Sequence, residues 1–282
     1  MTISEIKREL QHTLTSAVGE AEARAMALVI IEDIKGYKAV DVAVNGDRTL
    51  LDDTVERMRR VAARVVAGEP LQYALGSARF MGRDFKVTPD VLIPRPETAA
   101  LVDMIADDAG GRSDLRVLDI GTGSGCIAVT LALTLRFPDV TALDISLPAL
   151  QVARENAARY NAKVDFVEGD ILGEKNLRGR KFDIIVSNPP YVLESERAQM
   201  DPRVYAHEPE GALFVPDGDP LRFYRAIAEC GCKQLASGGR IYLEINPLCV
   251  TQLCDMLAGS GYNDVLARRD YRGQYRYITA TR

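Results

Sequence analysis

The feature that most constrains the fold is a regular alternation of strand-like and helix-like segments from residue 116 onward. Segments with helical spacing lie near 124–136, 147–161, 221–236 and 247–259. Between them are five apolar segments typical of buried strands: RVLDI (116–120), VTALDI (140–145), VDFVEG (164–169), FDIIVS (182–187) and RIYLEI (240–245). Because strands that alternate with helices pair in parallel, the pattern predicts an α/β domain with a mainly parallel sheet and helices on both faces.

Two further strand-like segments, VLARRD (265–270) and QYRYITATR (274–282), close the chain. They predict a terminal hairpin at the edge of the sheet. The expected sheet therefore has seven strands, with an antiparallel strand at its C-terminal end.

Residues 1–69 show a different pattern, which predicts a small helical bundle. Residues recur at helical spacing in three amphipathic segments: Ile3, Ile6, Leu10 and Leu14; Ala25, Leu28, Val29 and Glu32; and Val55, Met58, Val61, Ala62 and Val65, with Asp52 or Asp53 as a cap. Residues 70–90, interrupted by Gly76 and Gly82, predict a β-hairpin linker. The α/β domain then occupies residues 91–282.

Composition limits the classes of function. The net charge is −5 and the pI is about 5.3, so no basic footprint for duplex nucleic acid is evident. The first residues, MTISEIKREL, lack the apolar region of a secretory signal. The longest uncharged run, 120–135, has 16 residues, whereas a membrane span needs about 20. We therefore expect a cytoplasmic protein.

Cysteines and histidines are few and poorly spaced for metal or triad chemistry. The five cysteines form no C-x-x-C pair, and their odd number suggests reduced, buried thiols. With only His12 and His207 available, neither a zinc site nor a Ser-His-Asp triad is expected. The sequence predicts no metal.

A glycine-rich turn follows the first strand of the α/β domain. GTGSG comprises Gly121, Thr122, Gly123, Ser124 and Gly125, and a helix is expected to begin at once. Such a turn can be a plain tight turn, or it can bring a ligand close to the backbone and the helix N-terminus. The dinucleotide fingerprint G-x-G-x-x-G does not fit, because the third glycine comes one residue early.

Acidic residues accompany the ends of three successive strands. Asp119 precedes the glycine turn, where it would repel a pyrophosphate but could meet the ammonium of an amino-acid-bearing cofactor. Asp144 can bind both hydroxyls of a ribose. Asp170 can accept from the amine of an adenine, with Ile171 packing beside the ring. One such acid would be an ordinary loop carboxylate, but the set predicts an S-adenosylmethionine site at the ligand-binding edge of the sheet.

The fourth strand ends in Asn188, Pro189, Pro190 and Tyr191. Two prolines can simply terminate a strand. They can also hold a planar nitrogen for methylation, since the Asn188 side-chain oxygen and the Pro189 carbonyl can accept its N–H groups. Tyr191 can stack on the planar acceptor. Catalysis would then rest on orientation, an effect of up to about 7–11 kcal/mol.

GTGSG followed by NPPY resembles the amino-methyltransferases that act on DNA adenine, RNA guanine or protein glutamine. The segment PLQYALGSARFMGRDFKVTPDVLIPRPET (70–98) is more specific. It closely resembles the segment leading into the catalytic domain of the HemK/PrmC family, the release factor glutamine methyltransferases. The similarity continues through VLDIGTGSGCIAVTLA, the 207–213 segment and RDYRGQYRYI.

The resemblance implies a class I S-adenosylmethionine-dependent methyltransferase, Rossmann-like, with an N-terminal helical domain that docks the release factor. It implies methylation of the glutamine in the Gly-Gly-Gln motif of class 1 release factors, modulating translation termination, with S-adenosylhomocysteine as the other product. The implied cofactor site includes Gly121–Gly125, Asp144, Asp170 and Asn188, and the implied glutamine site includes residues 188–191. Arg95, Pro96 and Glu97 match a signature beside the active site, so we expect Arg95 and Glu97 to contact substrate.

Three positions depart from the family pattern. Ala99 stands where an acid is usual, Ile171 where an aromatic residue is frequent, and Pro220 within a customary Asp-Gly-Leu. None of them touches NPPY. The alternative functions are a nucleic-acid amino-methyltransferase using the same NPPY residues and an oxidoreductase or non-catalytic nucleotide-binding domain. The net negative charge argues against a nucleic-acid substrate. The spacing of the glycines, which departs from G-x-G-x-x-G, argues against a dinucleotide-binding domain. We expect a monomer that binds neither DNA nor membrane.

Overall fold

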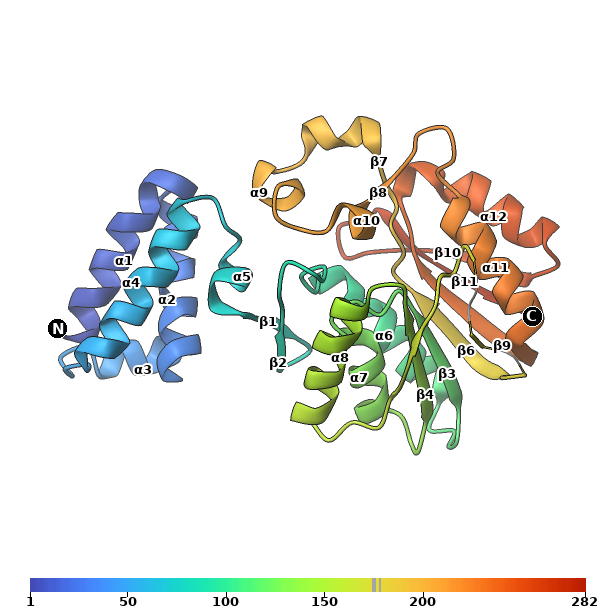
Figure 1. Cartoon of the computed structure of the whole chain (residues 1–282), viewed down its shortest axis with the longest axis horizontal. Helices are drawn as coiled ribbons and strands as arrows, with labels where there is room; N and C mark the ends of the chain where they lie inside the picture. The colour runs from blue at the N-terminus through green and yellow to red at the C-terminus, as the bar shows by residue number, and fades with distance from the viewer. Residues whose placement is uncertain (174–175, 178) are drawn as a thin grey trace. The chain divides into compact units, whose positions relative to one another are not determined.

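The computed structural model describes residues 1–173, 176–177 and 179–282 (Figure 1). The described chain divides into two compact units. The first comprises residues 1–77 and 202–207, and the second comprises residues 78–201 and 208–282. The domain boundaries expected at 69/70 and 90/91 stay a prediction.

The first unit is built from helices, as the sequence predicts. They are α1 (Ile3–Val18), α2 (Glu20–Lys35), α3 (Ala39–Val44), α4 (Asp52–Val66) and α5 (Leu71–Leu75), with the short α9 (Pro202–Tyr205). A capping box opens α1, in which the Thr2 side chain accepts from Glu5 N and the Glu5 carboxylate accepts from Thr2 N. The expected core faces of α1 and α4 are confirmed.

The predicted face of α2 is wrong. The helix buries Ala23, Ala27, Ile30 and Ile31, whereas Val29 is 45% exposed. The run AMALVII is apolar at every position, so it carries no phase from which one face could be chosen. The predicted cap of α4 is wrong as well. Leu51 is the N-cap, and the two aspartates lie in the first helical turn, where their charge favours the helix dipole.

Residues 70–90, which the sequence predicts as a β-hairpin linker, contain a helix in addition to the hairpin. Leu71–Leu75 forms the helix α5, which ends at Gly76 in the left-handed conformation. The hairpin follows as β1 (Ser77–Phe80) and β2 (Arg83–Lys86). The predicted hairpin is therefore confirmed, but the helical turn that precedes it was not predicted.

The second unit contains the predicted seven-stranded sheet, whose order is β10-β11-β9-β6-β3-β4-β5 (Figure 1). The strands are β3 (Arg116–Ile120), β4 (Asp139–Asp144), β5 (Asp165–Glu168), β6 (Phe182–Ser187), β9 (Leu235–Glu244), β10 (Asn263–Arg269) and β11 (Tyr275–Thr281). All neighbours pair in parallel except β11, which is antiparallel to both β9 and β10. The mainly parallel sheet with a C-terminal antiparallel strand is confirmed.

Helices cover both faces of this sheet. One face carries α6 (Pro96–Ala109), α7 (Cys126–Thr134) and α8 (Leu147–Arg159), and the other carries α11 (Arg222–Gln234) and α12 (Val250–Gly259), which follows the short η2 (Pro247–Cys249) (Figure 1). Alternate strand residues serve the two cores, since Val117 and Val186 pack with the first set of helices and Leu118 and Ile185 with the second.

The strand order places a crevice at β3. The chain proceeds from β3 to β4 and β5 on one side and then returns to β6 on the other. Ile120 pairs with Leu143 of β4 and with Ser187 of β6, so the three strands end level. In parallel sheets ligands bind outside the carboxyl ends of the strands at such a reversal. The connection from β6 to α11 carries β7 (Val192–Leu193), η1 (Glu194–Gln199), α10 (Glu210–Leu213) and β8 (Phe214–Val215).

Candidate active site

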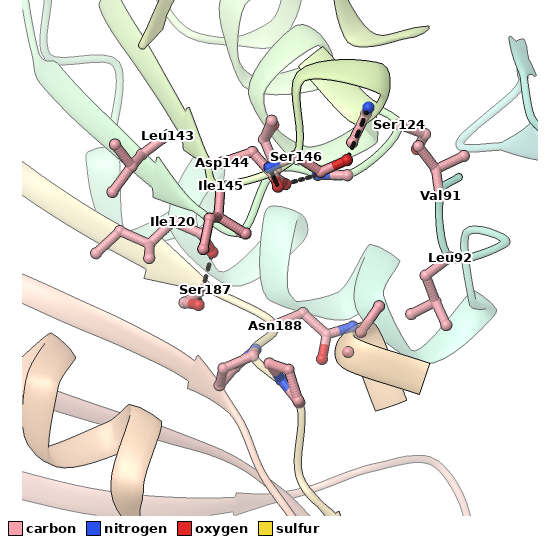
Figure 2. Close-up of a pocket in the computed structure, with 18 of the residues that line it drawn as sticks. Val91, Leu92, Ile120, Ser124, Leu143, Asp144, Ile145, Ser146, Ser187 and Asn188 are labelled. Atoms are coloured by element: carbon pink, nitrogen blue, oxygen red, sulfur yellow. Dashed lines mark hydrogen bonds between the residues drawn. The ribbon is translucent and has the colours of Figure 1, made fainter. Parts of the chain in front are cut away.

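A cavity of about 430 Å³ opens at the carboxyl ends of β3, β4, β5 and β6 (Figure 2). Figure 2 shows Asp144 and Ser146 on one side of it, Asn188 on another, and Val91 and Leu92 along a third. Most residues predicted from the sequence for the cofactor and glutamine sites line this cavity: Arg95, Gly121, Thr122, Gly123, Ser124, Asp144, Asp170, Ile171, Asn188, Pro189 and Pro190. Its volume suits a small-molecule ligand.

The glycine turn owes its shape to backbone conformations that other residues rarely adopt. Gly123 has φ +53° and Gly125, the N-cap of α7, has φ +79°. A Cβ on Gly125 would lie 3.0 Å from the Cβ of Ala153 in α8. Gly125 does not line the cavity. Its role is to let α7 pack closely against α8 while the preceding residues face the ligand site.

A buried amide fixes the turn in place. Asn156 of α8 is fully buried, and its Nδ2 donates to the carbonyls of Ser124 (2.8 Å) and Lys86 (3.0 Å). Its Oδ1 accepts from Lys86 N at 2.7 Å. One side chain therefore satisfies backbone groups of the glycine turn and of β2. We did not predict this role for Asn156 from the sequence.

Asp119 lies beneath the glycine turn and does not line the cavity. Its Oδ2 accepts from the Thr122 hydroxyl (2.7 Å) and from Ala128 N (3.2 Å). Its Oδ1 is buried, and no residue that the structure describes forms a hydrogen bond with it. Burial raises the pKa of Asp119 to about 7, and the neighbouring charge of Asp144 acts in the same direction. We expected Asp119 to contact the ammonium of a ligand, but its side chain lies outside the lining of the cavity.

Asp144 ends β4 at the wall of the cavity. Its Oδ2 accepts from Gly123 N at 2.8 Å and its Oδ1 from Ser146 N at 2.9 Å (Figure 2). Each carboxylate oxygen keeps a further lone pair for a ligand hydroxyl. Burial raises the pKa of Asp144 above its ordinary value. The backbone donors hold the carboxylate in one orientation at the ligand site.

Asp170 and Ile171 follow β5 and also line the cavity. Asp170 Oδ1 accepts from Leu172 N at 2.8 Å. Ile171 is buried, with 8% of its surface exposed, and it packs with Leu143 and Ile120 in the core beneath. The pair therefore presents one acceptor and one apolar surface side by side.

Asn188 is held by a residue of α6, which is in turn held by a residue of β9. Its Nδ2 donates to Thr98 Oγ1 of α6 at 3.1 Å, and the Thr98 hydroxyl donates to Glu244 Oε2 of β9 at 2.8 Å. Tyr191 donates its hydroxyl to Glu244 Oε1 at 2.9 Å. Burial raises the pKa values of Tyr191 and Glu244, and the Glu244 charge contributes to the shift of Tyr191.

A smaller cavity of about 150 Å³ adjoins the first and shares Arg95, Asn188 and Pro189 with it. Tyr191 lines this smaller cavity and not the larger one. Asn188 therefore stands where the two spaces meet. A group held in one space can approach a group held in the other at that residue.

Arg95 lines both cavities, and a buried acid fixes its position. Its Nη2 lies 2.5 Å from Glu208 Oε1, and the other Glu208 oxygen accepts from Ile93 N at 3.2 Å. Glu97, expected beside Arg95, lines neither cavity, and its carbonyl accepts from the Tyr277 hydroxyl. The structure brings Arg95 to the site and leaves Glu97 outside it.

Sequence reasoning missed Thr98, Glu208 and Glu244. A signal was present for Glu244, because an acid within the apolar strand RIYLEI needs a buried partner. That signal does not name the partner, and both Thr98 and Tyr191 lie more than fifty positions away in the chain. Glu208 gave no signal beyond its place in the 207–213 segment.

The residues at the larger cavity fit a cofactor that carries polar groups. Ser124 lines the cavity, and its buried hydroxyl lies beside the Cys126 thiol without a well-formed hydrogen bond to any described residue. Asp144 and Asp170 add carboxylates, while Ile171 and Leu172 add apolar surface. Among the described residues, no three His, Cys, Asp or Glu side chains gather as metal ligands would. Within the same residues, no helix has the length and apolar character to cross a membrane.

Two protein families match this chain. Residues 5–76 match the PrmC N-terminal domain, and residues 96–205 match the methyltransferase small domain. The first match falls on the helical unit and the second on the part of the sheet that carries the cavity.

Curated relatives match over almost the whole chain. The release factor glutamine methyltransferase of Bacteroides thetaiotaomicron is 42% identical over 280 residues, covering 99% of this chain and all of the relative. That of Flavobacterium psychrophilum is 36% identical over 281 residues, covering 99% and 98%. That of Bacillus subtilis is 41% identical and covers 74% of this chain and 73% of its own.

Solved structures confirm the class I methyltransferase fold. A Pyrococcus furiosus methyltransferase superposes with a TM-score of 0.53 at 20% identity, covering 78% of this chain and 96% of that one. The T. thermophilus 16S rRNA N2 G1207 methyltransferase, solved with AdoMet and guanosine, has a TM-score of 0.53 at 19% identity and covers 73% and 49%. At this identity the likeness concerns the fold alone.

Proposed function

The chain belongs to the release factor glutamine methyltransferase family, and on that premise we propose that it methylates the side-chain amide nitrogen of a release factor glutamine. The methyl donor is S-adenosylmethionine, and the glutamine is that of the Gly-Gly-Gln motif of class 1 peptide chain release factors. The observation that best supports the proposal is the position of Asn188, whose amide stands where a cofactor-sized cavity meets a smaller one.

The larger cavity supplies the cofactor contacts. Asp144 accepts from the ribose hydroxyls, and Asp170 with Ile171 receives the adenine. The backbone of Gly121 and Gly123 and the Ser124 hydroxyl face the amino-acid part. Asp119 acts from beneath the turn, through the N-terminal end of α7, instead of touching the ligand. S-adenosylmethionine supplies, when bound, a methyl group on a positively charged sulfur.

Asn188 and Pro189 hold the glutamine nitrogen. Its lone pair is delocalised into the amide, so the nitrogen is a weak nucleophile unless it is oriented. The Asn188 Oδ1 and the Pro189 carbonyl accept its two N–H groups and turn its free face toward the larger cavity. Pro190 fixes the direction of the Pro189 carbonyl. Tyr191 and Arg95 line the smaller cavity beside the side chain that enters.

The helical unit is proposed to dock the release factor, since residues 5–76 match the PrmC N-terminal domain. A substrate that works in translation termination places the protein in the cytoplasm. The nucleic-acid alternative is not favoured, because the curated relatives that match over most of this chain are named for a protein substrate. That the protein is a monomer remains a prediction.

Methyl-labelled S-adenosylmethionine, offered together with purified release factors, duplex DNA or ribosomal RNA in parallel, tests the proposal. We expect label in the release factor alone, and on its glutamine. A release factor with that glutamine replaced by alanine is the control and should stay unlabelled. Label found only in nucleic acid would overturn the proposed substrate.

A further inference from the structure

Behind Asn188 lies a chain of hydrogen bonds whose direction is fixed at one end. Glu244 is 1% exposed and Thr98 is 2% exposed, so both are buried, and of the two only Thr98 borders the larger cavity. Glu244 ends β9, Thr98 lies in the first turn of α6, and Asn188 follows β6. Three separate elements therefore converge on the amide that the proposed reaction uses.

Burial raises the pKa of Glu244. By contrast, the hydrogen bonds from Thr98 and Tyr191 and the charge of Arg276 favour its ionised form. As a carboxylate at the end of this hydrogen-bonded series, Glu244 can only accept hydrogen bonds. The Thr98 hydroxyl has a single proton, and its oxygen lies 2.8 Å from Glu244 Oε2, so that proton points to Glu244. The oxygen of Thr98 is then left as an acceptor for the group 3.1 Å away on Asn188. Only the NH₂ end of the Asn188 amide can fill that place.

The opposite rotamer of the Asn188 amide is excluded by the same contacts. It would place Oδ1 against Thr98 Oγ1 with no hydrogen between two oxygens. The other Glu244 oxygen gives no alternative, because it already accepts the Tyr191 hydroxyl at 2.9 Å. The Asn188 oxygen therefore faces away from Thr98, where it can accept from a substrate N–H.

We infer that Glu244, acting through Thr98, is a positioning residue that sets the direction of the Asn188 amide and keeps its oxygen available to the substrate nitrogen. The inference rests on the proposed function for the identity of that nitrogen. Glu244 lines neither cavity, so it affects the rate of methyl transfer only through the residues that it orients. Thr98, which lines the larger cavity, transmits the direction.

Glu244→Gln has nearly the same shape but can donate to Thr98. The threonine proton is then free to point at Asn188, and the amide can turn its NH₂ end toward the substrate. We expect kcat for glutamine methylation to fall about 100-fold, as for other losses of reactant orientation. The Kd for S-adenosylhomocysteine, measured by calorimetry, should stay close to that of the wild type, since Glu244 does not line the cofactor cavity.

Thr98 offers a matched pair of variants. Thr98→Val keeps the shape and removes the hydroxyl, so it should lose turnover as Glu244→Gln does. Thr98→Ser keeps the hydroxyl and should recover turnover to within about threefold of the wild type. Tyr224→Phe is the control for burial alone, because the buried Tyr224 hydroxyl donates to the backbone carbonyl of Glu244 and not to the chain of side chains. It should lower stability and spare kcat.

The wild-type enzyme is assayed first on a release factor, and no labelling there would refute the proposed function itself. With an active wild type, full turnover by both Glu244→Gln and Thr98→Val would refute the positioning role. Neutron diffraction from deuterated wild-type crystals gives a readout that needs no activity and no variant. The deuteron of Thr98 should point at Glu244, and finding it directed at Asn188 would overturn the inference.

Discussion

At Asn188 an amide with one donating and one accepting end stands between a hydrogen-bonded network and a ligand space. The amide donates a hydrogen bond to Thr98, and it lies at a half-buried position at the end of β6, outside the strand itself. Its removal should therefore affect chemistry more than folding. That separation makes the residue suitable for a decisive test of the proposed reaction.

Asn188→Ala should abolish methyl transfer, with a loss of about 100-fold or more, because one of the two acceptors proposed for the glutamine nitrogen is gone. Cofactor affinity should change little, since the acids at the ends of β4 and β5 remain. Single-turnover assays and calorimetric titration measure the two quantities separately. Normal turnover by this variant would contradict the proposed role of the amide.

Asp119 makes stability depend on pH. Its pKa is raised from 3.8 to about 7 in the folded protein, mainly by burial. The folded state therefore holds the proton more tightly than the unfolded state does. Stability from this group is fully present below pH 3.8 and is lost as the pH rises through about 7.

Asp119→Asn stays neutral throughout that range. The wild type should lose stability as the pH rises from 4 to 8, whereas the variant should not. The difference in the free energy of unfolding, variant minus wild type, should therefore grow by about one kcal/mol per pH unit, to a few kcal/mol in total. Urea unfolding at a series of pH values measures the difference. A difference that stays constant over the range would show that Asp119 is ionised in the folded state from the start.

At the scale of elements, the packing of α7 on α8 depends on one glycine. A Cβ at position 125 would meet Ala153 at 3.0 Å, and the backbone φ there is +79°. Gly125→Ala should cost about 1–2 kcal/mol from the left-handed conformation and a further ~1–3 kcal/mol from overpacking. Guanidinium unfolding measures the sum.

Gly238→Ala separates the two contributions. Gly238 has φ +74°, but nothing lies within 4 Å of the position that its Cβ would take. This variant should show only the conformational cost. If both variants lose equal stability, close helix packing is not what requires glycine at position 125.

The elements best predicted from the sequence are those whose pattern has a single interpretation. FDIIVS was predicted as a strand and is β6 to the residue, because a short apolar run bounded by Lys181 and prolines fits nothing else. The face of α2 failed because its apolar run has no phase, and α5 failed because a single turn leaves no periodicity. The ligand site followed from a topological rule, which places strand ends together without any knowledge of side-chain contacts.

The contacts between elements were not predictable in the same way. Glu244 with Thr98, and Glu208 with Arg95, join residues more than 100 positions apart. The sequence pattern around a buried acid indicates that the acid needs a partner, but the identity of that partner follows only from the packed structure. Asp119 shows the converse, since the sequence placed it correctly at a strand end and the packing then covered it.

The whole molecule contains separate hydrophobic cores. One lies among the helices of the first unit, and two others lie on the two faces of the sheet in the second unit. Proteins with separate cores frequently unfold in more than one transition. A ligand that binds one unit stabilises that unit by mass action and acts on the other only through coupling between them.

Scanning calorimetry with S-adenosylhomocysteine should therefore show two transitions, of which only the one belonging to residues 78–201 and 208–282 moves. At 100 times its Kd the ligand adds about 2.7 kcal/mol, which corresponds to roughly 5–10 °C for a unit of this size. Asp144→Ala removes a carboxylate from the cavity and should reduce that shift without altering the other transition. A single transition that the ligand moves as a whole would mean that the helical unit and the sheet unfold together, so that ligand binding in the second unit also stabilises the first.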